Sequence, residues 1–303
     1  MKNKVKVEDI TNNEVGSLLE IRNVFKKYNE VIIDEGWDLY ENGEKMKELD
    51  IASHMALNPG VEYKDSMNII GINPAFNAKT KKFEFYIAST NDLNILLSLI
   101  SLVNEPINIH SLSDSFNNNE IIKWCKDHTL PSVKKDEDLK LCNTEKNKFL
   151  YSSMPLDSFY REVTIIYLLF NTWRFLNSED FNKAKKYATK LRELTLGGKA
   201  KEINDNDDIN IILTAYIDLE MKSIYARFTN FGSNKLFLDT DNLFSMVYFQ
   251  LSNLMTKPIE SRKHLKECSN CHRLYWGHGN SRYCDNCDRR TVFSREHRGI
   301  KEG

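Results

Sequence analysis

Apolar positions recur with a helical period over most of the second half of the chain. The clearest case is residues 156–177, where apolar side chains return every three or four residues along one broad face. The members of this stripe are Phe159, Val163, Ile166, Leu169, Phe170 and Trp173. Similar patterns predict three further helices, over residues 178–194, 207–228 and 239–256. We therefore predict a helical bundle over residues 150–257.

Polar residues and a glycine near the ends of these predicted helices are expected to cap them. Ser178 opens the helix over 178–194, and Gly197 lies just beyond its end, where glycine commonly terminates helices. Asp207 or Asp208 is expected to cap the helix that follows.

The first half of the chain has weaker and more mixed patterns. Helical spacing over residues 15–33 and over 89–104 predicts two helices, and alternation over 81–89 predicts a strand. Residues 120–128 read as a short helix, and the charged stretch 131–148 reads as an exposed loop. Residues 1–130 are thus predicted to form a small α+β part with few strands.

Composition supports this picture. The 303 residues suffice for one large domain or for a main domain with a small appendage, and the low counts of Gly (12) and Pro (6) favour helices. The start of the chain has no apolar leader, and the longest apolar run, residues 164–170, is far below the roughly 20 residues of a membrane span. We expect a cytoplasmic protein with no membrane contact.

Charge is distributed unevenly along the chain. Residues 257–303 hold eleven Lys and Arg against six Asp and Glu, a net charge of +5. The totals of 42 and 43 leave 31 against 37 for residues 1–256, a net charge of −6. A basic end on an acidic body points to contact with an anionic polymer.

Four of the six cysteines lie in this basic end, as two Cys-x-x-Cys pairs. Cys268 and Cys271 form the first pair, and Cys284 and Cys287 form the second, twelve residues later. Such pairs bring four thiolates to one tetrahedral zinc ion, and in a reducing compartment metal binding is commoner than disulfides. Two glycines in "WGHGNS" between the pairs suit a hairpin reversal. We predict one Zn²⁺ in a zinc ribbon, in a structural role because four cysteines leave no position open for water.

The segment "KECSNCHRLYWGHGNSRYCDNCDRRTVFSREHRG" resembles the CGNR-type zinc fingers at the C-termini of bacterial proteins. The likeness rests on the two cysteine pairs, Tyr275, the run Arg282-Tyr283-Cys284, and the arginines after Cys287. It covers about forty residues, and it implies a DNA-binding role for them.

A basic helix is predicted after Cys287, ending at Gly299. Together with side chains of the cysteine segment it could neutralise phosphates, and Trp276 could stack on a base. The predicted nucleic-acid contacts are Lys266, Arg273, Trp276, Arg282, Arg289, Arg290, Arg295 and Arg298. Tyr275 and Tyr283 are expected in the small core of the module, whereas core and stacking roles stay equally open for Trp276.

Two alternatives remain beside nucleic-acid binding. The zinc tail could be purely structural in a non-catalytic protein-interaction protein. Less favoured is a helical-bundle ribonuclease, for which Arg290 and His297 would match a loose Arg-x₄₋₆-His pattern. No other catalytic pattern stands out, so no enzyme is predicted.

The remaining isolated carboxylates and cysteines of residues 1–256 are interpreted as structural and not as catalytic or metal-binding. Asp157, Glu162 and Glu220 are expected to face solvent or to be paired. Cys125 and Cys142 are expected to be buried as small apolar residues.

The sequence as a whole predicts a mostly α protein: an α+β region over residues 1–130, a helical bundle over 150–257, and a Cys₄ zinc ribbon with a basic helix over 262–303. The proposed partner is DNA, with RNA as an alternative, in a regulatory role. The acidic body would sense a signal, form a homodimer or hold a partner, and the pattern does not choose among these.

Overall fold

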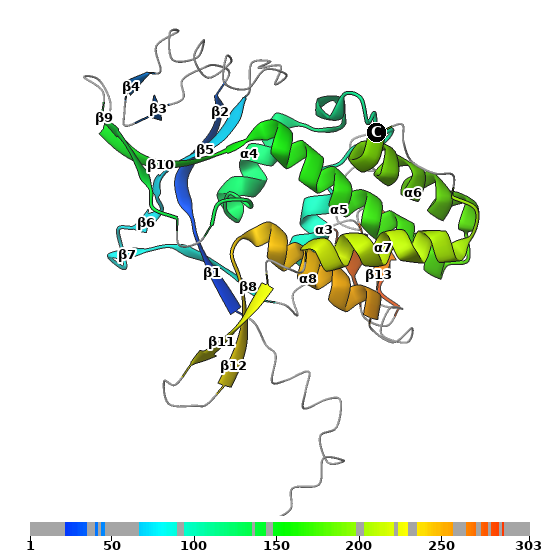
Figure 1. The fold of residues 1–303 in the computed structure, drawn as a ribbon. Coiled ribbons are helices and arrows are strands. Elements are labelled where there is room, and N and C mark those ends of the chain that lie inside the picture. The colour runs from blue at the N-terminus through cyan, green and yellow to red at the C-terminus, as the bar shows by residue number, and fades with distance from the viewer. Residues whose placement is uncertain are drawn as a thin grey trace, which may run out of the picture.

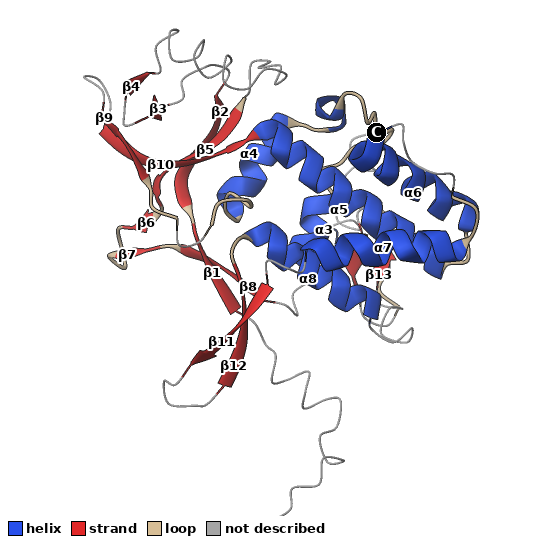
Figure 2. Cartoon of the chain, in the orientation of Figure 1, coloured by secondary structure: helices blue, strands red, loops and turns tan. Residues whose placement is uncertain are grey.

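A helical half and a half of small antiparallel sheets make up the fold (Figure 1 and Figure 2). The computed structural model describes residues 22–34, 40–41, 44–45, 67–89, 94–134, 137–143, 148–197, 203–220, 224–229, 235–256, 265–270, 274–277, 280–284 and 287. The helical content expected from the sequence is confirmed, and the described residues contain more strands than expected.

The helices pack around α5. The described helices are α3 (Asn94–Ile100), α4 (Asn118–Asp127), α5 (Leu156–Asn177), α6 (Phe181–Leu196), α7 (Asn206–Glu220) and α8 (Leu243–Thr256), with a 3₁₀ turn, η2, at Leu112–Ser115. Helix α5 contacts α3, α6, α7 and α8. Its consecutive residues Leu168, Leu169 and Phe170 are all fully buried, so more than one face of this helix is covered. The helix predicted over residues 156–177 is therefore confirmed, and it lies deeper than a single stripe implies.

The strands form one four-stranded sheet and five two-stranded ribbons. The bounds are β1 (Arg22–Lys26), β2 (Tyr28–Asp34), β3 (Tyr40–Glu41), β4 (Glu44–Lys45), β5 (Asn68–Pro74), β6 (Phe76–Asn77), β7 (Lys82–Phe83), β8 (Phe85–Ser89), β9 (Lys140–Asn143), β10 (Lys148–Pro155), β11 (Ile224–Thr229), β12 (Lys235–Thr240), β13 (Leu265–Glu267) and β14 (Leu274–Trp276). The larger sheet has the antiparallel order β2-β5-β10-β9. The ribbons pair β1 with β8, β3 with β4, β6 with β7, β11 with β12, and β13 with β14.

One large buried cluster joins the two halves. It includes Phe25 and Val31 from the first strands, Leu96 from α3, Phe159 from α5 and Leu251 from α8. A second, smaller cluster of Ile70 and Tyr151 lies on the four-stranded sheet. The predicted limits at residues 130, 150 and 257 stay a prediction, although buried residues from both sides of 130–150 share the main cluster.

The helix predicted over residues 15–33 is wrong in its described part, which forms β1 and β2. Phe25, Tyr28 and Val31 are buried at intervals of three residues, which imitates a helix. The spacing instead arises from two short strands joined at Lys27, one paired with β8 and the other with β5. Pairing with strands more than 30 residues away decided the outcome.

Two further expectations need correction. The predicted loop over 131–148 contains β9, which pairs with β10, and its Leu141 is 45% exposed, as suits an edge strand. The helix predicted over 207–228 ends at Glu220, and Ile224–Thr229 forms β11 against β12. Branched and aromatic residues such as Ile224, Tyr225 and Phe228 favour a strand once a partner strand is present.

Of the predicted caps, Ser178 is not the capping residue, whereas Gly197 and Asp208 lie at helix ends as expected. The side chain of Asp180, not Ser178, accepts a hydrogen bond from the Lys183 amide (3.1 Å) at the start of α6. Asp205 accepts from the amide of Asp208 (2.9 Å) at the start of α7, and Asp208 accepts from the amide of Asn204 (2.8 Å). Gly197 does end α6, with φ of 65°.

Candidate metal centre

Cys268 directly follows the first strand of the β13–β14 hairpin. Leu265 pairs with Trp276, and Glu267 pairs with Leu274, so the two strands are antiparallel. The reversal expected at the glycines of "WGHGNS" stays a prediction, because His278 and Gly279 lie outside the described residues.

The second pair returns alongside the first. The Ser269 amide donates to the Arg282 carbonyl (2.9 Å), which ties the two segments together. The Cys287 amide donates to the Cys284 carbonyl (2.8 Å), a tight turn that brings the Cys284 and Cys287 side chains to one side. Backbone hydrogen bonds therefore hold Cys284 and Cys287 close to Cys268.

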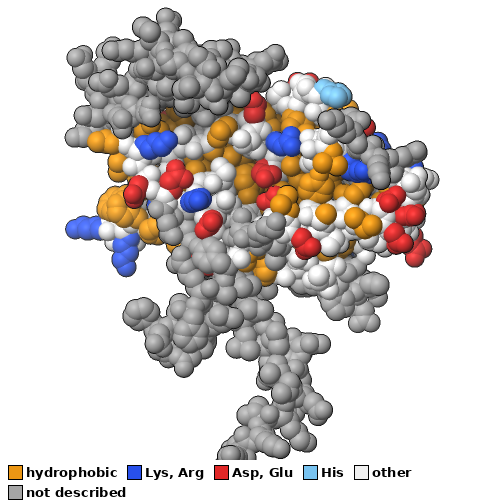
Figure 3. Space-filling view, viewed as in Figure 1, with side chains coloured by type: hydrophobic (Ala, Val, Ile, Leu, Met, Phe, Trp, Pro, Cys, Tyr) orange, Lys and Arg blue, Asp and Glu red, His pale blue; other side chains and the backbone are white. Residues whose placement is uncertain are grey.

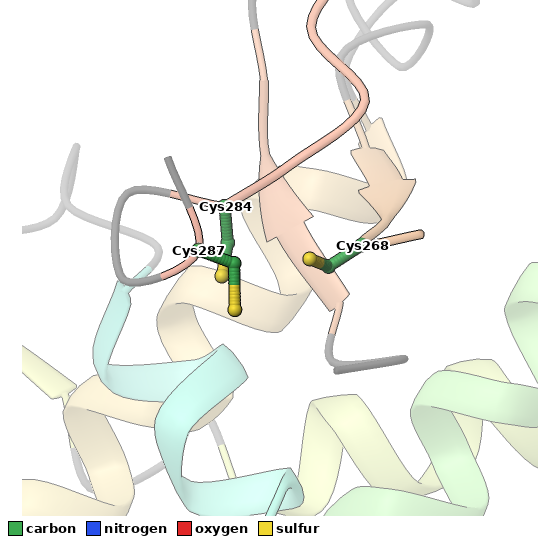
Figure 4. A group of neighbouring side chains, drawn as sticks. All are labelled: Cys268, Cys284 and Cys287. Carbon is green, nitrogen blue, oxygen red and sulfur yellow. The ribbon is translucent and has the colours of Figure 1, made fainter. Parts of the chain in front are cut away.

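Three thiols converge at this point (Figure 4). The Sγ atoms of Cys268, Cys284 and Cys287 all lie within 4.8 Å of one another. Four sulfurs bound to a tetrahedral ion at about 2.3 Å would lie about 3.8 Å apart, so the three sulfurs are within reach of one metal ion. Cys268 is fully buried and Cys284 nearly so, and the side-chain amide Nδ2 of Asn270 donates to Cys287 Sγ (3.3 Å). The fourth predicted ligand, Cys271, lies outside the described residues.

Polar contacts close the loop between the two pairs. The Tyr275 hydroxyl donates to the Ser281 carbonyl (2.8 Å), and Lys266 Nζ donates to the same carbonyl (3.3 Å). A Cβ on Gly277 would lie 2.6 Å from Tyr275 Cε2, so only glycine fits at this close approach. Tyr275 and Tyr283 are both partly buried, in agreement with a structural part for them.

The hairpin is docked on the helical body. Leu265 and Leu274 pack against the main buried cluster, and β14 contacts α3. Glu267 lies 3.7 Å from Arg174 of α5 in an ion pair. The cysteine cluster is therefore attached to the body by apolar packing as well as by the chain.

The structure describes few of the predicted nucleic-acid contacts. Arg282 is exposed, whereas Lys266 is half-buried and held by Ser281. Trp276 lies in β14, and its side chain is outside the described part. Outside it too lie Arg273, Arg289, Arg290, Arg295, Arg298 and His297, and with them the predicted basic helix.

Sequence reasoning missed a pocket lined by α5, α7, α8 and the end of α6. It has a volume of about 590 Å³, and Glu162, Glu220 and Tyr216 contribute to its lining. Burial, and after it the negative charge of Glu220, raises the pKa of Glu162 to about 7, although a hydrogen bond from Tyr248 (3.3 Å) acts in the opposite direction. Burial also raises the pKa of Glu220. Glu162 and Glu220 were considered separately from the sequence, and the structure brings them to one pocket, where Glu162 has the Tyr248 hydroxyl as a partner.

A signal for this arrangement was present in the sequence. Glu162 lies four residues before Ile166, on the same stripe of α5 that was predicted to be buried. Asp157 also lines a pocket, next to Tyr160, and Cys125 is fully buried as predicted. The side chain of Cys142 is outside the described part.

Comparisons of the chain with family models, with curated proteins and with solved structures give no match. Among the described residues, no helix is both long enough and apolar enough to cross a membrane.

Proposed function

We propose that Cys268, Cys271, Cys284 and Cys287 bind one structural Zn²⁺, and that the module they form binds a nucleic acid, DNA in a regulatory role. The observation that carries the metal is the convergence of three of these sulfurs within 4.8 Å. Thiolate ligands favour zinc over the hard cations calcium and magnesium. Four thiolates close the coordination shell, so the ion would act in folding and not in catalysis.

The nucleic-acid part rests on charge. Residues 257–303 carry a net charge of +5 next to a body of −6, and Arg282 is exposed beside the cysteine cluster. A cationic module fixed to an acidic body would direct a polyanion to the module and away from the helices. Docking through Leu265 and Leu274 would couple binding there to the state of the body.

Metal analysis of the full chain tests the first part. Protein purified under reducing conditions is expected to contain one equivalent of zinc. Cys284→Ser should lower that content to below about half an equivalent, because a ligand is lost. Cys125→Ser is the matched control: this buried cysteine lies far from the cluster in sequence, so the metal content should not change. Equal zinc in both variants would reject the site.

Mobility shifts with the full chain and duplex DNA test the second part. If three phosphates are neutralised, affinity should fall roughly 40-fold between 50 and 200 mM salt. Arg282→Ala should weaken binding and lower the salt slope by about one unit, whereas Lys186→Ala on exposed α6 should not. No binding even at low salt would reject this part.

One observation favours the alternative of a purely structural tail. The β13–β14 hairpin is packed on the body and paired with Arg174, as expected of an element that clamps the fold. A chain that binds one zinc, loses stability on its removal and binds no nucleic acid would establish this alternative.

A further inference from the structure

An exposed apolar face runs along strands β7 and β8. Phe83, Phe85 and Ile87 are 57%, 52% and 62% exposed. Within β8 the alternate residues Tyr86 and Ala88 pack toward the core, whereas Glu84, between the two phenylalanines, is exposed. Val24 lies opposite Ile87 on β1, and Phe76 lies opposite Phe83 on β6. These five exposed residues, here the apolar face, lie on two antiparallel ribbons, β6–β7 and β1–β8, which follow each other along the chain. In globular proteins, large exposed apolar patches usually mark sites of interaction with a partner or ligand.

Three of the five residues are phenylalanines that lie together. Phe76 and Phe83 contact edge to face, with ring centroids 5.5 Å apart. Phe83 ends β7 and Phe85 begins β8, two positions later, which is a separation of roughly 6.8 Å for an extended chain. That is a spacing at which neighbouring rings can each receive a separate base of an extended strand.

Positive charge lies at the end of this face. Lys79 and Lys81 lie in the turn between β6 and β7, and Lys82 begins β7; all three are exposed, and among the described residues none of them has an ion-pair partner. The single acidic residue of segment 75–89, Glu84, accepts a hydrogen bond from Asn77 (3.1 Å). Figure 3 shows hydrophobic side chains at the β6–β7 end of the molecule beside protruding Lys and Arg side chains. The surface therefore combines aromatic rings with unpaired cations.

We propose that the apolar face and the lysine turn bind a single-stranded nucleic acid, with bases stacked on Phe76, Phe83 and Phe85 and phosphates held by Lys79, Lys81 and Lys82. Stacking on aromatic side chains needs unpaired bases, so a duplex does not fit the aromatic part. An antiparallel sheet face with outward aromatics is a surface on which single strands lie.

A membrane surface fits this face less well. A loop that enters a bilayer needs apolar residues at its tip, but the tip here is Ala78-Lys79-Thr80-Lys81. The phenylalanines instead lie along the flanks of the two ribbons, behind the lysines.

The inference goes beyond the proposed function and uses none of its residues. Figure 1 places β6 and β7 on the opposite side of the view from β13. A substitution that abolishes binding at one of the two sites is therefore expected to leave binding at the other site unchanged.

Fluorescence anisotropy with the full chain tests the proposal, using labelled 16-nucleotide poly-dT and poly-U at about 50 mM salt. Phe83→Leu and Phe85→Leu keep the apolar character but lose the ring, and each is expected to weaken binding about 5-fold or more. Leu196→Ala is the matched control, because Leu196 is also 57% exposed but lies at the end of α6. It should leave binding unchanged. Lys82→Gln should lower the salt slope by about 0.7.

The outcomes separate the alternatives. Equal binding of poly-dT and poly-U supports stacking without sugar selection, and a preference for one of them identifies the natural polymer. Chelation should leave single-strand binding intact, whereas Phe83→Leu should leave duplex binding intact. The proposal is overturned if neither polymer binds, or if the phenylalanine variants bind as well as the control. It is also overturned if the phenylalanines are instead needed for binding to vesicles with 30% phosphatidylserine or for self-association.

Discussion

At the scale of single residues, Glu162 is the clearest departure from ordinary protein chemistry. It lies mostly buried on α5, in a pocket that it shares with Glu220, and its pKa is raised to about 7, first by burial and then by that second carboxylate. The Tyr248 hydroxyl is the partner that partly offsets this, and burial with the nearby carboxylates raises the pKa of Tyr248 well above its usual value. Folding therefore favours the protonated form of Glu162.

The consequence is a stability that falls as pH rises. The folded chain holds a proton on Glu162 that the unfolded chain releases between about pH 4.5 and 7, so stability is lost across that window. Glu162→Gln keeps an acceptor for Tyr248 and cannot ionise. The wild type should lose stability as the pH rises, and the variant should not. The difference in unfolding free energy, variant minus wild type, should therefore increase by about 2 kcal/mol between pH 5 and 8. Urea unfolding at several pH values measures this.

Two controls sharpen that prediction. Glu193→Gln on the exposed side of α6 should give no pH-dependent difference. Glu220→Gln removes the second charge, so it should lower the pKa of Glu162 and shrink the effect. A difference between Glu162→Gln and wild type that stays constant with pH would contradict the burial argument.

At the scale of elements, the centre of the four-stranded sheet depends on a glycine. Gly71 lies in β5 between Val31 of β2 and Ser152 of β10. The ring of Tyr28, only 2% exposed, lies against it, and a Cβ on Gly71 would come within 2.5 Å of that ring. Contacts that close are not found between real atoms, so the strand and the tyrosine fit only with glycine at this position.

Gly71→Ala is therefore expected to destabilise the chain by about 2 kcal/mol, because the buried ring must move in a packed core. Tyr28→Leu removes the ring and has a cost of its own. The double variant should be less destabilised than the sum of the two single variants, since alanine then has room. Denaturant unfolding of all four proteins measures the coupling, and strictly additive losses would contradict this packing.

At the scale of the whole molecule, the last described hairpin belongs to the fold of the body. Leu265 and Leu274 pack on the cluster that extends from the first strands to α8, and Glu267 faces Arg174. The exposed ion pair contributes little, about 0–1 kcal/mol, so apolar packing provides most of the attachment. Metal binding next to the hairpin would therefore stabilise more than the local segment.

Removal of the metal is expected to lower the melting temperature of the full chain, by about 2–4 °C for each kcal/mol of docking that is lost. Cys284→Ser should give the same lowered value, and a chelator should have no further effect on that variant. Circular dichroism of the helices provides the readout, because they lie outside the cysteine segment. If the helical transition is insensitive to chelator, the hairpin is not coupled to the body.

The sequence by itself determined the helices and the grouping of the cysteines. Residues 156–177 carry their burial pattern in their own 3.6-residue period, and the two Cys-x-x-Cys pairs are recognisable because a short spacing limits where their thiols can go. Both signals are local.

Only the tertiary structure decided features that depend on distant partners. Residues 22–34 became strands because β8 and β5 pair with them, the sulfur of Cys268 met those of Cys284 and Cys287 across a folded turn, and Glu162 met Glu220 across two helices. The apolar face on β7 and β8 became visible only when the other side of β8 was seen to be buried. Periodicity records how a residue is oriented on its own element, whereas its neighbours are set by where the rest of the chain packs.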